Sequence, residues 1–289
     1  LRALQQYPNL YIIGAGASYG IVPTTKQLSD EIIRSWLSIG GYGIFNEEKN
    51  DTFDRVVNLY GLQSIDLALV NMMPRNSLDW LISYFLSVHY ENFPQYRLFN
   101  NLPGRSIFLS YNLDGLTGYL GYKHIVFHPH GKIPPGLKKN FDNDLFFDLL
   151  ENNVETPWKS ETLIIRPEAY KIYKRPDIEF LIDKWKYLRN IIIIGYSFSM
   201  FDNSFDDYYS FLMLTEMMKH YHNNVFVIDP YPEFLKYHIE EAINRTISVY
   251  PFKWNILSPI VNNLIQLVGV MKINKYWSNI LKQYKRNDV

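Results

Sequence analysis

The chain contains no cysteine among its 289 residues. This absence excludes disulfide bonds, a cysteine nucleophile and zinc held by thiolates. It also suits a reducing compartment, so we expect a cytoplasmic protein. An excess of charge is missing too, because 29 Lys and Arg residues balance 29 Asp and Glu residues. A neutral chain has no overall attraction to nucleic acid or to an anionic membrane, and we expect direct binding to neither.

Long hydrophobic runs are also missing from the sequence. No stretch reaches the roughly 18 apolar residues of a membrane-spanning helix. The longest candidate, residues 257–271, is interrupted by Asn262, Asn263 and Gln266. Hydrophobic residues nevertheless make up 47% of the chain, which is enough to build a buried core. We therefore expect a folded globular protein without a membrane segment.

Short apolar runs alternate with helical periodicity along the chain, which is typical of a parallel sheet with crossover helices. The four isoleucines at 191–194 are typical of a strand buried on both faces. We predict strands over residues 10–14, 106–110, 124–128, 191–195, 225–229 and 247–250. We predict helices over residues 25–39, 52–60, 64–72, 77–90, 205–221 and 232–243. The predicted fold class is α/β, with a Rossmann-like doubly wound parallel sheet.

The spacing of these predicted elements is uneven. Residues 25–103, between the first and second strands, indicate an inserted helical lobe. Residues 131–176 are rich in Pro, Lys and Asn and indicate a second, irregular insertion, with one weak strand at 162–165. We predict a single domain over residues 1–289 that carries both insertions. We expect them to cover the carboxyl edge of the sheet, where ligands bind in such folds.

A glycine-rich turn directly follows the first predicted strand, with the sequence Gly14-Ala15-Gly16-Ala17-Ser18. Glycines let the backbone approach a diphosphate closely, and the start of the next helix attracts negative charge. Gly20 falls one place later than the third glycine of the common dinucleotide fingerprint. Nucleotide binding and a simple tight turn therefore both stay open. Hydride-transfer chemistry is disfavoured, because no acidic residue closes a second strand to bind a ribose.

Polar residues follow the second and third predicted strands as well. Asn112 can donate and accept hydrogen bonds, and Asp114 carries a negative charge. An Asx turn in which Asp114 caps a helix would explain the same residues. His128 and His130 flank a proline after the third strand. They fit a general base, a shared metal or a hydrogen-bonded turn.

In this order and context, the motifs resemble those of the sirtuin superfamily. Residues 14–18 are similar to the sirtuin phosphate-binding loop. Residues 110–114 are similar to the segment that places an Asn and an Asp around nicotinamide and its ribose, and His130-Gly131 is similar to the catalytic His-Gly pair. Residues 195–197 are similar to the Gly-x-Ser segment near the adenosine ribose. The strand that ends at Asp229 is similar to the last nucleotide-binding strand, so the resemblance spans residues 10–232.

The chain departs from protein-deacylating sirtuins in several ways. It lacks the cysteines of their four-cysteine zinc module, and Thr24-Thr25 follow Pro23 where Asp-Phe-Arg is usual. Asp229 stands where sirtuins usually have Asn. Together with Tyr111 and Asp202, these departures make the chain resemble more closely the sirtuin-like NADases of bacterial antiphage defence.

The resemblance implies an NAD hydrolase that cleaves the nicotinamide–ribose bond to give nicotinamide and ADP-ribose. NAD is then the substrate, and no zinc is expected. Such a protein would be an antiviral defence effector that works as a homo-oligomer, with a partner protein or with an attached sensor domain, and this assembly would gate its activity.

The same resemblance implies a role for each candidate site residue. Asn112 would orient the ribose or a water, Asp114 would contact the nicotinamide side, and His130 would bind a ribose hydroxyl and act as base. The NAD-binding residues would be Gly14, Ala15, Gly16, Ala17, Ser18, Gly195, Ser197 and Asp229. Within this set the 14–18 loop would hold the diphosphate by backbone N–H groups and the Ser18 hydroxyl.

Three other functions stay open at this point. A protein deacylase would need a peptide-binding cleft, which the missing zinc module disfavours. A binding module would hold NAD or a related nucleotide without cleaving it, although Asn112 and His130 argue for chemistry. A metal-dependent hydrolase would use His128 and His130 with a carboxylate, but it would leave the glycine-rich turn unexplained.

Overall fold

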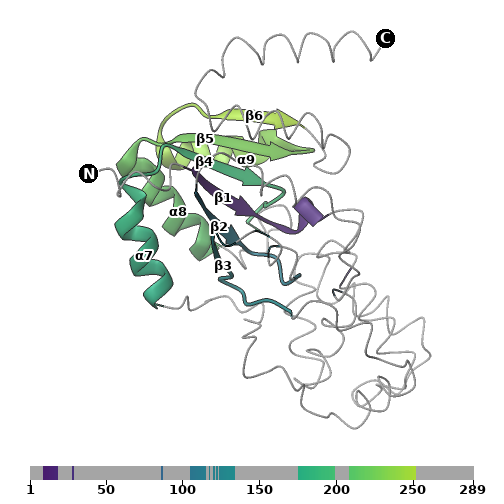
Figure 1. The fold of residues 1–289 in the computed structure, drawn as a ribbon. Coiled ribbons are helices and arrows are strands. Elements are labelled where there is room, and N and C mark those ends of the chain that lie inside the picture. The colour runs from purple at the N-terminus through teal and green to yellow at the C-terminus, as the bar shows by residue number, and fades with distance from the viewer. Residues whose placement is uncertain are drawn as a thin grey trace, which may run out of the picture.

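The computed structural model describes residues 9–18, 105–114, 124–133, 175–198 and 208–251, with the single residues 28, 86, 117, 120 and 122. These residues form a six-stranded sheet with three α-helices beside it (Figure 1). The strands are β1 (Asn9–Ile13), β2 (Ser106–Ser110), β3 (Ile125–Phe127), β4 (Asn190–Ile194), β5 (Asn224–Asp229) and β6 (Ser248–Pro251). The helices are α7 (Arg175–Trp185), α8 (Tyr208–Tyr221) and α9 (Pro232–Ile243), and the short 3₁₀ helix η2 (Ala15–Ser18) follows β1.

The strand order across the sheet is β3-β2-β1-β4-β5-β6, and all neighbouring strands run parallel. This is the order of the Rossmann fold, in which the direction of winding reverses between β1 and β4. The predicted α/β, Rossmann-like fold class is therefore confirmed. Helix α7 connects β3 to β4, α8 connects β4 to β5, and α9 connects β5 to β6. All three connections run in the same direction across the sheet, so right-handed crossovers place the three helices on one face.

The hydrophobic core lies between this face of the sheet and the three helices. Alternate strand residues such as Leu10, Ile12 and Ile193 belong to one core cluster, which also includes Trp185 of α7, Leu214 of α8 and Ile239 of α9. The opposite face is just as buried, since Tyr11, Phe108 and Ile192 are at most 1% exposed. Burial on both faces explains why these strands are hydrophobic without alternation.

Three asparagines pair across the amino ends of β1, β4 and β5. Asn190 donates to the side-chain oxygen of Asn9 at 2.8 Å, and Asn224 donates to that of Asn190 at 3.1 Å. The asparagines occupy matched positions in the strand register. This ladder explains why β1, β4 and β5 each begin one residue earlier than predicted: a polar first residue does not extend an apolar run, but here it pairs with its neighbours.

The other predicted strands and helices agree with the structure to different degrees. The helix at 232–243 and the strand at 106–110 are confirmed with the predicted bounds. The predicted strand at 124–128 is shorter, because both terminal histidines lie outside the β3 ladder. The strand predicted at 247–250 begins and ends one residue later. The sequence prediction missed α7, although Asp177 in its first turn and the buried pair Leu181 and Trp185 are typical of a helix.

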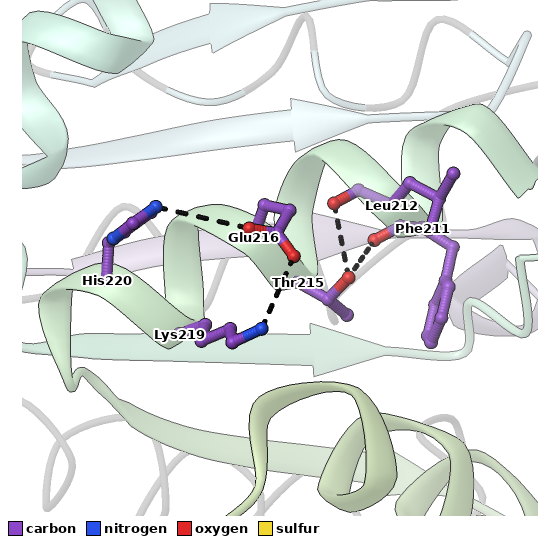
Figure 2. Close-up of polar contacts among 6 residues, drawn as sticks. All are labelled: Phe211, Leu212, Thr215, Glu216, Lys219 and His220. Carbon is purple, nitrogen blue, oxygen red and sulfur yellow. Dashed lines mark hydrogen bonds and ion pairs between the residues drawn. The ribbon is translucent and has the colours of Figure 1, made fainter.

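Helix α8 illustrates how one helix serves both the core and the solvent (Figure 2). The buried Thr215 hydroxyl donates to the carbonyl oxygen of Phe211, at 2.7 Å. One residue further on, Glu216 faces the solvent, 3.8 Å from the Lys219 ammonium and 4.0 Å from the His220 ring. Such exposed pairs contribute little to stability, so the core side of α8 anchors the helix.

Much of the predicted insertions lies outside the described residues. This applies to the helical lobe at 25–103, apart from residues 28 and 86, and to the irregular segment between 133 and 175. Within the part of the chain that the structure describes, no helix has the length and apolar character needed to cross a membrane.

Candidate functional site

The glycine-rich turn lies at the point where the sheet reverses its direction of winding, between the carboxyl ends of β1 and β4. The Gly14 N–H donates to the carbonyl oxygen of Ile194 at 3.0 Å, and the Gly16 N–H donates to that of Gly195 at 2.9 Å. The loops after β1 and β4 are thus bonded directly to each other. A ligand site is expected at this position in open α/β sheets.

The glycines in these two loops are required by the contact between the loops. A methyl group on Gly14 would lie 2.5 Å from the Gly195 carbonyl oxygen and 2.5 Å from the Cα of Tyr196. Gly195 has a left-handed φ of 56° and touches the main chain of Gly16 and Ala17. The close approach of the two loops therefore requires glycine at these positions, whether or not a ligand binds there. The N–H groups of Gly14 and Gly16 are already used within the protein.

A chain of buried side-chain hydrogen bonds joins the glycine-rich turn to the end of β2. Asn112 Nδ2 donates to Ser18 Oγ at 3.0 Å, and Ser18 Oγ donates to Asp114 Oδ2 at 2.7 Å. All three side chains are at most 5% exposed. We call Asn112, Ser18 and Asp114 the polar relay. The Ser18 proton is directed to Asp114, so in this arrangement the Ser18 hydroxyl does not donate to a ligand.

The polar relay fixes which atom Asn112 can offer to a ligand. Since Nδ2 donates to Ser18, the amide cannot rotate without losing that bond, and Oδ1 faces the other way. Oδ1 is buried and has no hydrogen-bond partner among the residues that the structure describes. A buried amide oxygen without a partner costs free energy, which suggests that it is kept to accept a hydrogen bond from a ligand.

His130 reaches the same region through stacked aromatic rings. Its ring packs edge-on against Tyr111, with 5.0 Å between ring centroids, and Tyr111 stacks on Tyr196 at 4.3 Å. Tyr196 in turn contacts Phe198, so the rings bridge the ends of β2, β3 and β4. His130 is 7% exposed. The packing restricts its ring and places the His130 turn next to the segment that carries Asn112.

His128 lies one turn away and faces a different group. Its Nε2 atom lies 3.1 Å from the hydroxyl of the fully buried Thr117. Burial, helped by the charge of Lys132, lowers the pKa of His128 from 6.5 to about 4, while the main chain of Asn112 acts in the opposite direction. The ring is therefore neutral near pH 7. Around this histidine and elsewhere in the described ranges, no three metal-ligating side chains come together.

Ser197 follows β4, and Asp229 is the last residue of β5, so both lie at the same carboxyl edge of the sheet. Asp229 is half-buried and accepts the Tyr231 N–H at 2.9 Å. Burial raises the pKa of its carboxyl group, and this hydrogen bond partly offsets the rise. The Gly195 N–H donates to the carbonyl oxygen of Ile228, which ties the two loops together. A carboxylate in this position could accept hydrogen bonds from a ribose diol.

The structure thus brings the predicted motifs together at one edge of the sheet. Parallel pairing of β2 with β1 and β3 aligns the three strand ends, and the polar relay joins two of the motifs directly. The sequence analysis did not identify Thr117 or the ring contact between Tyr111 and His130. A single threonine carries no signal by itself, and only the fold brings it to His128.

Neither a family model nor a curated protein matches the chain. Among solved structures, it is similar to a Sir2 homolog–NAD complex, with 13% identity, 93% of each chain covered and a TM-score of 0.42. It is also similar to a structure described as the basis for the mechanism and regulation of Sir2 enzymes, with 12% identity, 92% of this chain and 95% of the other covered, and a TM-score of 0.45. The Rossmann-like fold assignment stands on the strand order itself and does not depend on these likenesses.

Proposed function

We propose that the chain is an NAD hydrolase that releases nicotinamide and leaves ADP-ribose. The observation that carries the proposal is the polar relay, which holds the buried Oδ1 atom of Asn112 ready to accept a hydrogen bond beside the glycine-rich turn. The Sir2 homolog in one of the similar structures is complexed with NAD, and the sequence motifs resemble those of sirtuins. This chain's site would bind NAD with the reacting ribose next to Asn112.

The reaction would break the bond between ribose C1′ and the nicotinamide ring nitrogen. The bonding electrons leave with the nitrogen, so the positively charged ring becomes neutral nicotinamide while positive charge grows on the ribose. Asn112 Oδ1 would accept a hydrogen bond from a ribose hydroxyl or from the attacking water, which orients it toward C1′. Asp114 places a carboxylate next to this site, where negative charge stabilises the growing positive charge.

Water then adds to C1′ and must lose a proton. His130 is the candidate base, because its ring is held by Tyr111 and it follows β3 at the same edge of the sheet. Its proposed role is to bond a ribose hydroxyl and to accept the proton that water releases. ADP-ribose and nicotinamide are the products, with one proton released to solvent.

The remaining NAD contacts are assigned by position. The 14–18 loop would face the diphosphate, and Gly195, Ser197 and Asp229 would face the adenosine ribose. The Ser18 hydroxyl would not bind a phosphate oxygen directly, because its proton is directed to Asp114. Gly14 and Gly16 would act by allowing the two loops to meet, because their N–H groups are bonded within the protein.

We propose a cytoplasmic effector of antiviral defence, because the departures of the sequence resemble those of defence NADases. Free NAD hydrolysis would harm the host cell. Activity would therefore be low until the chain assembles with further copies, a partner protein or a sensor domain.

Product analysis tests the proposal. Purified protein at low and high concentration is incubated with NAD, alone and with an acetyl-lysine peptide, and the products are separated by chromatography. Equimolar nicotinamide and ADP-ribose without peptide are expected. Turnover only with peptide, giving O-acetyl-ADP-ribose, would establish a deacylase instead. NAD binding without products at every concentration would indicate a binding module.

A further inference from the structure

His128 bonds the turn that carries Asn112 and Asp114 from the β3 side. The His128 Nε2 atom and the Thr117 hydroxyl lie 3.1 Å apart, and Thr117 follows Asp114 by three residues. The main chain of Asn112 also faces the His128 ring. Farther along, the Ile133 N–H donates to the carbonyl oxygen of Leu113 at 2.7 Å. The segment after β3 therefore bonds the chain near Asn112 and Asp114 at two places, Leu113 and Thr117.

The chemistry of His128 fits a fixed neutral contact better than proton transfer. Nε2 is engaged with a hydroxyl that is itself fully buried. Burial and Lys132 keep the pKa of His128 near 4, so a base of this strength would hold a proton poorly at neutral pH. A neutral imidazole can donate from one ring nitrogen and accept at the other. Here Nε2 makes the contact with Thr117, and Nδ1 has no hydrogen-bond partner among the described residues.

We propose that His128 is a positioning residue for the candidate site: by its contact with Thr117, it helps to hold the chain at Asn112 so that Asn112 Oδ1 faces the reacting ribose. This inference rests on the proposed function, because the orientation of Asn112 affects turnover only if Asn112 contacts the substrate. His128 itself touches neither NAD nor the attacking water. Its contribution depends on the hydrogen bond to Thr117 and not on proton transfer to the substrate or to water.

A matched pair of variants at Thr117 tests this proposal. Thr117→Val keeps the shape and removes the hydroxyl, whereas Thr117→Ser keeps the hydroxyl and removes a methyl group. Two measurements are made on the full chain under activating conditions. The first is kcat and KM for NAD, and the second is amide hydrogen exchange of the peptide that contains residues 111–114.

The expected result separates the two variants. In Thr117→Val, kcat falls by about 10- to 100-fold while KM stays near the parent value, because a misplaced group costs turnover more than binding. Exchange becomes faster in the 111–114 peptide and not in peptides from α8 or α9. Thr117→Ser behaves like the parent in both measurements. A general loss of folding would instead raise exchange everywhere and would affect both variants.

The outcomes that overturn the proposal are distinct from those that overturn the proposed function. If the parent cleaves NAD and Thr117→Val turns over equally fast, or Thr117→Ser loses as much, His128 does not position the turn. If the parent releases no nicotinamide, the proposed function fails, and exchange alone decides on positioning. Unchanged exchange at 111–114 in Thr117→Val then overturns it, and faster exchange confined to that peptide supports it.

Discussion

Replacing Ser18 with alanine removes the centre of the polar relay with a change of one atom. Asn112 Nδ2 loses its acceptor, and Asp114 Oδ2 loses a donor, at a site where both side chains are at most 5% exposed. Each buried group that loses a hydrogen bond costs about 1–3 kcal/mol, and a charged group costs more. Ser18→Ala should therefore destabilise the fold by about 2–5 kcal/mol and still leave most molecules folded.

Ser18→Ala should also reduce turnover, and by more than the loss of folded protein alone would explain. Without Ser18, the Asn112 amide can rotate, and Oδ1 no longer has one fixed direction. Loss of a preorganised polar contact costs on the order of 10²–10³ in rate. We therefore expect folded Ser18→Ala protein to release nicotinamide at least about 100-fold more slowly than the parent.

Ser110 offers a matched control for this prediction. It is a serine at the end of β2, fully buried, and its hydroxyl has no hydrogen-bond partner within the described part of the chain. Ser110→Ala removes the same atom without breaking a bond, so stability should stay equal or rise slightly. Chemical denaturation and nicotinamide release are measured for both variants. Equal stability and equal turnover of Ser18→Ala and Ser110→Ala would refute the reasoning about the polar relay.

Three further predictions concern the sheet and its loops. Asn190→Ala breaks both hydrogen bonds of the asparagine ladder and should cost about 1–3 kcal/mol for each buried group left unpaired, measured by urea denaturation; an unchanged midpoint would contradict it. Gly195→Ala should prevent native folding, because its φ is left-handed and its Cβ would meet the main chain of Gly16, and a parent-like melting curve would contradict it. Because the folded pKa of His128 lies below its unfolded value of 6.5, stability should fall as pH drops from about 6.5 to 4; His128→Gln should lose this component, and a pH profile identical to the parent's would contradict it.

The fold could be predicted from the sequence because most of its strands are short, almost uninterrupted apolar runs. The isoleucines at 191–194 and the apolar runs at 10–13 and 106–110 are buried on both faces, so their composition alone marks them. The sequence predicted a doubly wound parallel sheet but not the order of its strands. Polar first residues such as Asn190 hid the true strand starts, because pairing between asparagines across strands cannot be seen in one segment.

The sequence predicts where the candidate site residues lie, at the ends of parallel strands. It does not predict the hydrogen bonds between their side chains. Residues at parallel strand ends must share one edge of the sheet, which placed Asn112 and His130 correctly. The hydrogen bond between Ser18 and Asp114 joins residues 96 positions apart, and nothing local indicates it. The sequence leaves both nucleotide binding and a tight turn open for Gly14, and only the resemblance assigns Gly195 to NAD binding. In the structure both glycines allow the contact between the two loops.

Asn112 and His130 are proposed to act on NAD at this edge of the sheet. The most direct test is nicotinamide release by Asn112→Ala and His130→Ala, with Ser110→Ala as the folded control and NAD binding measured in parallel by calorimetry. We expect turnover to fall by about 10²–10³ for Asn112→Ala and about 10²–10⁴ for His130→Ala, with NAD still bound. Parent-like nicotinamide release by both variants would contradict the account.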